Sequence, residues 1–146
     1  MKYARNPQRK MLLLLSMVIA SVVLSAQVPV PATVHIYRYR LSVEQTRHPK
    51  VSCDAFPVAR MQNGRVYAIR VSPGWHVFAT MDDPTGIRVD IMAGKEYFVR
   101  IDYPVNSTYS DRATATLVAP EQGRMEILKL RALDGQYIEA STCGNP

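Results

Sequence analysis

The chain has 146 residues, of which 18 are basic and 12 acidic, so its formal net charge at pH 7 is +6. Four of the basic residues stand among the first 26, which leaves 14 basic and 12 acidic residues, a charge of only +2, for the remainder. The later arginines are scattered along predicted strands rather than gathered in a run. A nucleic-acid-binding domain needs a basic stripe on its surface, so this pattern argues against a nucleic acid as partner.

The first 26 residues predict a secretory signal peptide. A basic start precedes an apolar run over 11–24, and Ser25-Ala26 closes the segment. The run is shorter than the roughly 18 apolar residues of a membrane-spanning helix. We predict cleavage after Ala26 and a location in the periplasm or outside a bacterial cell. The alternative is an uncleaved segment that anchors the protein to the membrane, since Leu24 is larger than the residue preferred at that place. The basic residues of the start are Lys2, Arg5, Arg9 and Lys10.

The remaining 120 residues suit one domain. Residues 27–32 contain Pro29 and Pro31 and predict an extended linker, residues 33–133 the folded domain, and residues 134–146 a C-terminal tail. Cys53 and Cys143 are the two cysteines of the chain, and in an exported protein a lone pair predicts a disulfide bond. We expect this bond to attach the tail. The alternative, a reactive thiol, lacks a neighbouring basic cluster in the sequence.

In chain order, the first predicted strand covers Thr33 to Leu41 and carries large residues on both sides, which favours a position near the middle of the fold. Residues 42–50 are polar and predict a loop. The next strand, over 51–61, is interrupted by Pro57, which confines it to a sheet edge or splits it. Asn63-Gly64 then predicts a tight turn.

The stretch 65–103 alternates apolar and polar residues with period two, as a half-buried sheet requires. After it, 113–118 predicts a short strand. The segment 124–133 fits both helical and strand spacing, and its helix-forming residues favour one short helix that ends at Asp134-Gly135. We therefore predict an all-β fold, an antiparallel β-sandwich with one short C-terminal helix. The strands of the central stretch are expected over 66–71, 75–81, 87–91 and 96–103.

Three aromatic residues, Trp75, Tyr37 and Tyr39, are the candidate ligand-binding residues, because an exposed aromatic ring at a sheet margin can stack on a sugar. Aromatic residues in strands more often form part of the core or cross-strand pairs. We keep both roles as expectations.

The sequence predicts neither a metal site nor a catalytic site. His35, His48 and His76 are far apart and share no spacing with acidic or cysteine ligands, and His76 is expected to be a solvated strand residue. No nucleophile motif, phosphate-binding glycine loop or zinc-protease motif occurs. We expect no catalytic residue and no cofactor, and therefore a protein that is not an enzyme.

From residue 32 to about 131, the order of motifs resembles a bacterial exported family, the domain of unknown function 2846. The resemblance implies an immunoglobulin-like or transthyretin-like β-sandwich without catalytic residues. This chain differs from the family pattern in the second-strand hairpin, where Asp54-Ala55 stands in place of the usual Asp-Gly, and in having its two cysteines. The motifs are Ala32-Thr33-Val34-His35-Ile36-Tyr37-Arg38, Asn63-Gly64-Arg65-Val66-Tyr67, Pro73-Gly74-Trp75-His76, Ala93-Gly94-Lys95-Glu96-Tyr97-Phe98-Val99-Arg100 and Glu121-Gln122-Gly123-Arg124.

These observations predict an exported, non-catalytic domain that acts by binding, with another protein of the cell envelope as its partner. The alternative is a carbohydrate-binding or peptidoglycan-binding module that uses Trp75. Contact with a membrane is expected only through an uncleaved signal segment.

Overall fold

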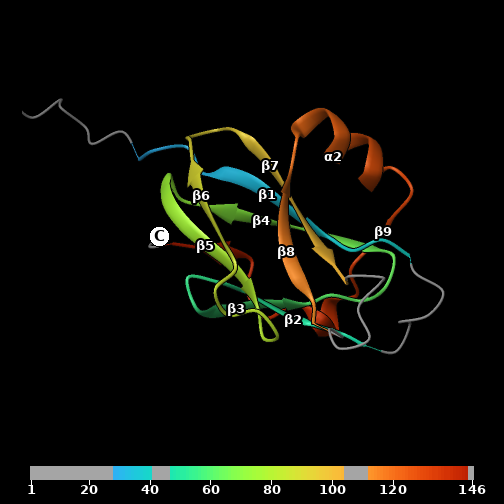
Figure 1. The fold of residues 1–146 in the computed structure, drawn as a ribbon. Helices are drawn as coiled ribbons and strands as arrows, with labels where there is room; N and C mark the ends of the chain where they lie inside the picture. The colour runs from blue at the N-terminus through green and yellow to red at the C-terminus, as the bar shows by residue number, and fades with distance from the viewer. Residues whose placement is uncertain (1–27, 41–46, 104–111, 145–146) are drawn as a thin grey trace, which may run out of the picture.

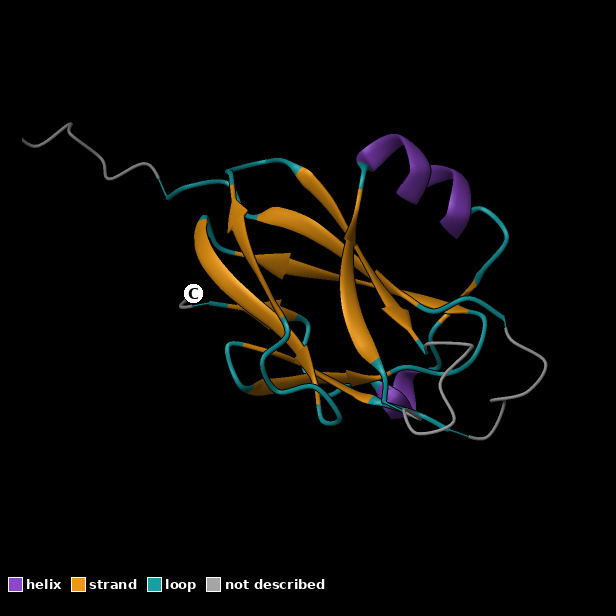
Figure 2. Ribbon diagram, viewed as in Figure 1, coloured by secondary structure: helices purple, strands orange, loops and turns teal. Residues whose placement is uncertain are grey.

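In the part of the chain that the structure describes, two β-sheets and one α-helix make up the fold (Figures 1 and 2). The computed structural model describes residues 28–40, 47–103 and 112–144. The all-β fold class with one short helix is confirmed. The predicted signal segment lies outside the described residues. No helix in the described part of the chain has both the length and the hydropathy that crossing a membrane requires.

Sheet A is the larger sheet, and its strand order is β10-β4-β1-β7-β8, with β9 also paired to β4. β1 lies at its centre, as the large residues on both of its faces predict. Val34 and Ile36 point to the side shared with the second sheet, whereas Tyr37 belongs to a separate cluster beneath the helix. The strands of sheet A are β1 (Ala32–Tyr37), β4 (Arg65–Val71), β7 (Glu96–Asp102), β8 (Thr114–Val118), β9 (Arg131–Ala132) and β10 (Thr142–Cys143).

Sheet B is antiparallel throughout, with the order β3-β2-β5-β6. The weak strand predicted over 51–61 is split into β2 and β3, and Pro57 lies in β3, at the edge of the sheet, as its missing N–H predicts. The strands of sheet B are β2 (Lys50–Cys53), β3 (Phe56–Arg60), β5 (Gly74–Thr80) and β6 (Ile87–Ile91).

The prediction of a purely antiparallel sandwich is wrong for sheet A. β1 and β7 are parallel neighbours, and both β9 and β10 run parallel to β4. Parallel neighbours need a long connection between them. Here the connection comprises the four strands of sheet B and also β4. It carries the chain from Tyr37, where β1 ends, back to the end of sheet A where β1 begins and where Thr33 pairs with Glu96 of β7.

The helix, α2 (Pro120–Ile127), is displaced from its predicted place at 124–133. It begins with Pro120 in its first turn, where a proline costs nothing because the first N–H groups of a helix have no internal partner. Arg131 and Ala132, which we expected to be helical, instead pair with Arg65 and Val66 as strand β9.

The β2–β3 turn holds two non-glycine residues in the left-handed region, Asp54 (φ 52°) and Ala55 (φ 69°). Cys53 pairs with Phe56, so the loop has two residues, and positive φ at both marks a type I′ turn, which favours glycine at its second position. Ala55 occupies that position. Asp54-Ala55 therefore forms the kind of turn that Asp-Gly favours, with alanine at the position where glycine has no steric cost.

We expect Ala55→Gly to raise the free energy of unfolding by about 0.5–1 kcal/mol, because glycine removes the Cβ clash at positive φ. Urea denaturation of both proteins measures the difference. The matched control is Ala68→Gly in β4, an exposed strand position without positive φ, where the same change should lower stability by about 0.5–1 kcal/mol. Equal destabilisation by both variants would contradict the role given to the turn.

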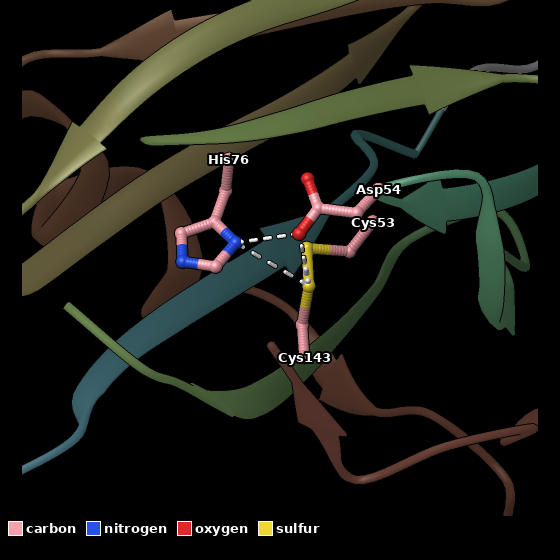
Figure 3. A group of neighbouring side chains, drawn as sticks. All are labelled: Cys53, Asp54, His76 and Cys143. Carbon is pink, nitrogen blue, oxygen red and sulfur yellow. Dashed lines mark hydrogen bonds and ion pairs between the residues drawn. A yellow bond between two sulfur atoms is a disulfide. The ribbon is translucent and has the colours of Figure 1, made fainter. Parts of the chain in front are cut away.

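A disulfide bond joins the two sheets. Cys53 ends β2 in sheet B and Cys143 ends β10 in sheet A, and their Cα atoms are 6.0 Å apart (Figure 3). The N–H of Ser72 also donates to the carbonyl of Cys143 (3.2 Å). The segment after Asp134 is thus tied to both sheets by covalent and backbone bonds.

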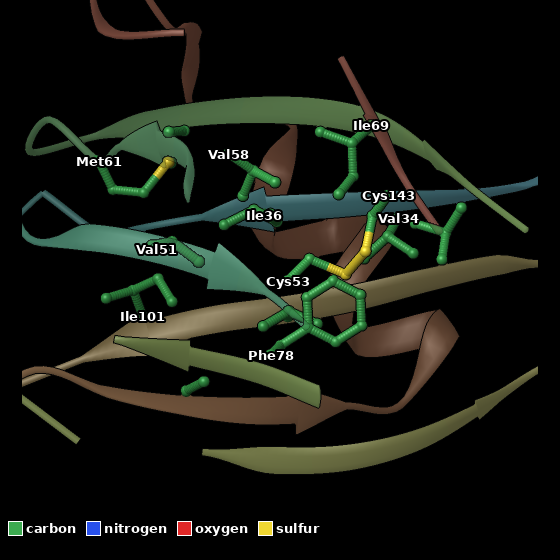
Figure 4. Packing of buried hydrophobic residues seen from close by; sticks show 14 of the residues in the cluster. Val34, Ile36, Val51, Cys53, Val58, Met61, Ile69, Phe78, Ile101 and Cys143 are labelled. Atoms are coloured by element: carbon green, nitrogen blue, oxygen red, sulfur yellow. A yellow bond between two sulfur atoms is a disulfide. The ribbon is translucent and has the colours of Figure 1, made fainter. Parts of the chain in front are cut away.

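The main core lies between the sheets and takes side chains from both (Figure 4). A second, smaller cluster, Tyr37, Phe98 and Val118, lies on the other face of sheet A, where Ile127 of α2 packs against it. Sheet A is therefore buried on both faces, and α2 covers part of the outer one. The largest members of the main core include Ile36, Val51, Met61, Ile69, Phe78, Ile91 and Ile101.

Candidate functional site

Basic side chains from three separate segments line one cavity of about 380 Å³, which we call the basic pocket. Arg40 follows β1, Arg65 begins β4, and Lys129 and Arg131 follow α2. Arg65 and Arg131 are direct partners in the β4–β9 register, which brings two residues 66 positions apart to one place. The remaining lining residues are His48, Gln62, Asn63 and Gly64.

The basic pocket carries a concentrated positive charge, because no aspartate or glutamate is among its described lining residues. Arg65 is held in place: its Nη1 donates to the carbonyl of Ala132 (3.1 Å), and its Nη2 lies 3.6 Å from a carboxylate oxygen of Asp134. Asp134 offsets part of one charge at the margin. The Oε1 atom of Gln62 is buried and has no hydrogen-bond partner among the described residues. The pocket thus offers several cations together with polar side chains.

A polar network beside the basic pocket fixes α2 to sheet A. The carboxylate of Glu126 accepts hydrogen bonds from the Tyr37 hydroxyl, from Nη1 of Arg100 (3.1 and 3.3 Å) and from Nε2 of Gln122 (2.6 Å). Nε of Arg100 also donates to both carboxylate oxygens of Asp102 (2.8 and 3.0 Å). A second cavity of about 500 Å³ borders this network and shares Arg40 and Lys129 with the basic pocket.

Glu126 and Tyr37 keep fixed protonation states in this network, because the pKa of the carboxyl group is lowered and that of the hydroxyl group is raised. Burial acts to raise the pKa of Glu126, but hydrogen bonds from tyrosines and Gln122 together with the charge of Arg100 outweigh burial and lower the pKa to about 2. Burial and the same carboxylate raise the pKa of Tyr37 above its ordinary value. A carboxylate with so low a pKa is a poor general base, and its tyrosine partner keeps its proton. The network positions α2 and the lysine that follows it.

The structure does not bring the three candidate aromatic residues together. Tyr37 is fully buried beneath α2, so its ring cannot serve as a surface for a sugar. Tyr39 is half-buried and lines the cavity next to the basic pocket, with its ring centroid 6.2 Å from that of Tyr37. Trp75 stands on β5 of sheet B and is 59% exposed. The Arg88 guanidinium lies over its ring, 4.6 Å from the centroid.

The prediction of a solvated His76 is wrong, because its side chain is buried. Alternation along β5 directs Trp75 and Val77 outward and places His76 on the inner side with Phe78. A polar ring is tolerated there because both of its nitrogens have partners, Asp54 and the carbonyl of Ser72. Of the other histidines, His35 bonds to Glu96 (2.8 Å), and His48 lines the basic pocket.

Comparison of the chain with protein-family models, with curated proteins and with solved structures gives no match. The resemblance to the domain of unknown function 2846 therefore stays a prediction that rests on the order of its motifs.

Proposed function

We propose that the protein is an exported, non-catalytic β-sandwich of the immunoglobulin-like or transthyretin-like kind that binds an acidic segment of another envelope protein. The observation that carries this proposal is the basic pocket, where Arg40, Arg65, Lys129 and Arg131 surround one cavity without a carboxylate among its described lining residues. Three of the four cations are arginines, whose planar guanidinium groups match carboxylates in a two-point geometry.

The polar lining favours a peptide as the occupant. A peptide with aspartate or glutamate side chains supplies carboxylates for the cations and backbone N–H and C=O groups for the polar side chains of Gln62 and Asn63 that line the pocket. Backbone N–H groups are absent from simple anions such as phosphate. Export is supported by the predicted signal segment and by the disulfide bond, since disulfides persist mainly in oxidising compartments.

The test is crosslinking in intact cells with a photoreactive residue in place of Arg40, followed by mass spectrometry of the captured peptide. We expect one recurrent partner, crosslinked through an acidic segment. Lys129→Gln with Arg131→Gln should weaken the purified complex about tenfold, because two exposed ion pairs contribute roughly 0.2–1 kcal/mol each. Added salt should weaken it further.

The matched control is Lys95→Gln with Arg112→Gln, which removes the same charge at exposed positions outside the basic pocket. This control should retain binding at constant ionic strength. Capture of a partner that both double variants bind equally well would overturn the role of the basic pocket.

Carbohydrate binding is a second candidate function, favoured by the exposed ring of Trp75 with Arg88 beside it. Trp75→Ala should abolish retention on cell-wall polysaccharide while leaving the far-ultraviolet circular dichroism unchanged. If no protein is crosslinked and retention on the polysaccharide depends on Trp75, carbohydrate binding replaces protein binding as the proposed function. If Trp75→Ala unfolds the domain, the ring is structural and this second candidate is dropped.

A further inference from the structure

Four side chains with metal-binding atoms converge where the two sheets are joined (Figure 3). Cys53 and Asp54 come from the end of β2 and its turn, His76 from β5 and Cys143 from β10. Their ligand atoms all lie within 4.8 Å of one another. The sequence predicts no such group, because its members are brought together by strand pairing and by the disulfide rather than by a short spacing. His76 also provides Cys143 with a basic neighbour in space, although no basic cluster lies near either cysteine along the chain.

Two separations around Cys143 fit a tetrahedral metal, and the third, to the sulfur of Cys53, must widen after the disulfide bond is broken. Its sulfur lies 3.6 Å from Oδ2 of Asp54 and 3.8 Å from Nδ1 of His76. In a tetrahedral zinc site, the usual bond lengths place neighbouring ligand atoms roughly 3.3–3.8 Å apart. Nδ1 of His76 and Oδ2 of Asp54 are closer, at 2.7 Å, so they must separate by about 0.6 Å when a metal replaces the proton between them.

Backbone groups already orient both non-cysteine ligands. The carbonyl of Ser72 lies 2.8 Å from Nε2 of His76, and since a carbonyl only accepts, Nε2 carries a proton and Nδ1 is the atom that faces the cysteines. Oδ1 of Asp54 accepts from the N–H of Val77 (2.9 Å), which leaves Oδ2 directed at the cluster. Such outer contacts are what fix a metal-binding histidine or carboxylate in its productive orientation.

We propose that these four side chains form a Zn²⁺ site when the disulfide is reduced. A dithiol reductant supplies two electrons and two protons, breaks the S–S bond and is itself oxidised to a disulfide. Zn²⁺ then binds two thiolates, one carboxylate oxygen and one imidazole nitrogen. Each thiol releases its proton, and the proton that lies between Nδ1 of His76 and Oδ2 of Asp54 is released as well.

The surroundings allow the movement that this exchange requires. A cavity of about 340 Å³ borders the cluster, and its lining includes Cys53, Asp54, Cys143 and Gly144. Cys143 lies in a strand of only two residues, so its sulfur can withdraw from Cys53 without disturbing a long strand pairing. The metal would connect the same two sheets as the disulfide. The site therefore offers two alternative crosslinks, one for oxidising and one for reducing conditions.

The test is titration of the purified protein with Zn²⁺ against a competing chromophoric chelator. The protein is first reduced with a phosphine, because dithiols themselves bind zinc. We expect one Zn²⁺ per chain after reduction and none in the oxidised protein. His76→Gln should weaken binding tenfold or more. His35→Gln is the matched control, a histidine bonded to Glu96 in sheet A, and it should leave the affinity unchanged.

X-ray absorption at the zinc edge of the unaltered, reduced protein makes the test independent of how well the variants fold. Two sulfur and two nitrogen or oxygen neighbours are expected. A first shell without sulfur, or with more than two sulfurs because the metal is shared between chains, would overturn the proposal. So would a reduced protein that takes up no Zn²⁺, or a folded His76→Gln variant with the affinity of the unaltered protein.

Discussion

Replacing Cys53 and Cys143 together by alanine is expected to lower the free energy of unfolding by about 3–5 kcal/mol. The bond closes a loop between residues 90 positions apart, and the chain-entropy model assigns a loop of that length about 4–5 kcal/mol. Measured losses of stability are usually smaller than this model gives. Replacing two buried sulfur atoms by hydrogen also removes packing contacts in the main core, which adds to the loss. Guanidinium denaturation followed by circular dichroism, with a chelator present to exclude zinc, measures the loss.

Reduction of the disulfide bond in the unaltered protein provides a control for the double alanine substitution. A phosphine should destabilise the unaltered protein by a similar amount and should leave the double alanine variant unchanged. Since Cys143 connects β10 to both sheets, the loss should appear in the cooperative unfolding of the whole domain. A loss below about 1 kcal/mol would mean that the bond holds only the tail, in disagreement with its position between the sheets.

The all-β fold could be predicted because most strands carry alternation over five or more residues and end at recognisable turns. The direction of the strands could not be predicted in the same way, because alternation is identical in parallel and antiparallel pairs. The parallel pairing of β1 with β7 follows from the path of the chain through sheet B. β9 and β10, with two residues each, are too short to show any period.

The basic pocket could not be predicted from the sequence for a related reason. Arg65 and Arg131 look scattered until the β4–β9 register makes them neighbours. Lys129 lies in the turn that follows α2, and Arg131 begins the two-residue strand β9, so no regular spacing along the chain marks them as neighbours.

His76 shows a limit of hydrophobicity as a guide to orientation. With Trp75 and Val77 beside it, the pattern favours an inward tryptophan and an outward histidine. The opposite arrangement holds because Asp54, held at positive φ in the β2–β3 turn, supplies the hydrogen bond that makes a buried imidazole tolerable. The candidate metal site and the strained turn are thus parts of the same local structure, and neither can be inferred from spacing along the chain.

Gly123→Ala in α2 is expected to lower the free energy of unfolding by about 1–3 kcal/mol, although alanine is the better helix former by about 1 kcal/mol. A Cβ atom on Gly123 would lie 2.2 Å from Cγ and 2.5 Å from Cβ of Phe98, a fully buried ring that also stacks on His35 (4.9 Å between centroids). Phe98 cannot yield, so α2 must move away from sheet A. That movement should lengthen the contacts of Glu126 with the sheet.

Thermal and urea denaturation of Gly123→Ala and Gly135→Ala measure this effect against a matched substitution. No neighbouring atom lies within 4 Å of the Cβ position on Gly135, so the same added methyl group should be neutral or slightly stabilising there. If Gly123→Ala instead stabilises the protein, as helix propensity alone predicts, α2 does not pack on Phe98 as described. Because Lys129 follows α2 directly, a destabilising Gly123→Ala should also weaken binding at the basic pocket, which links the close approach of one helix to the proposed function.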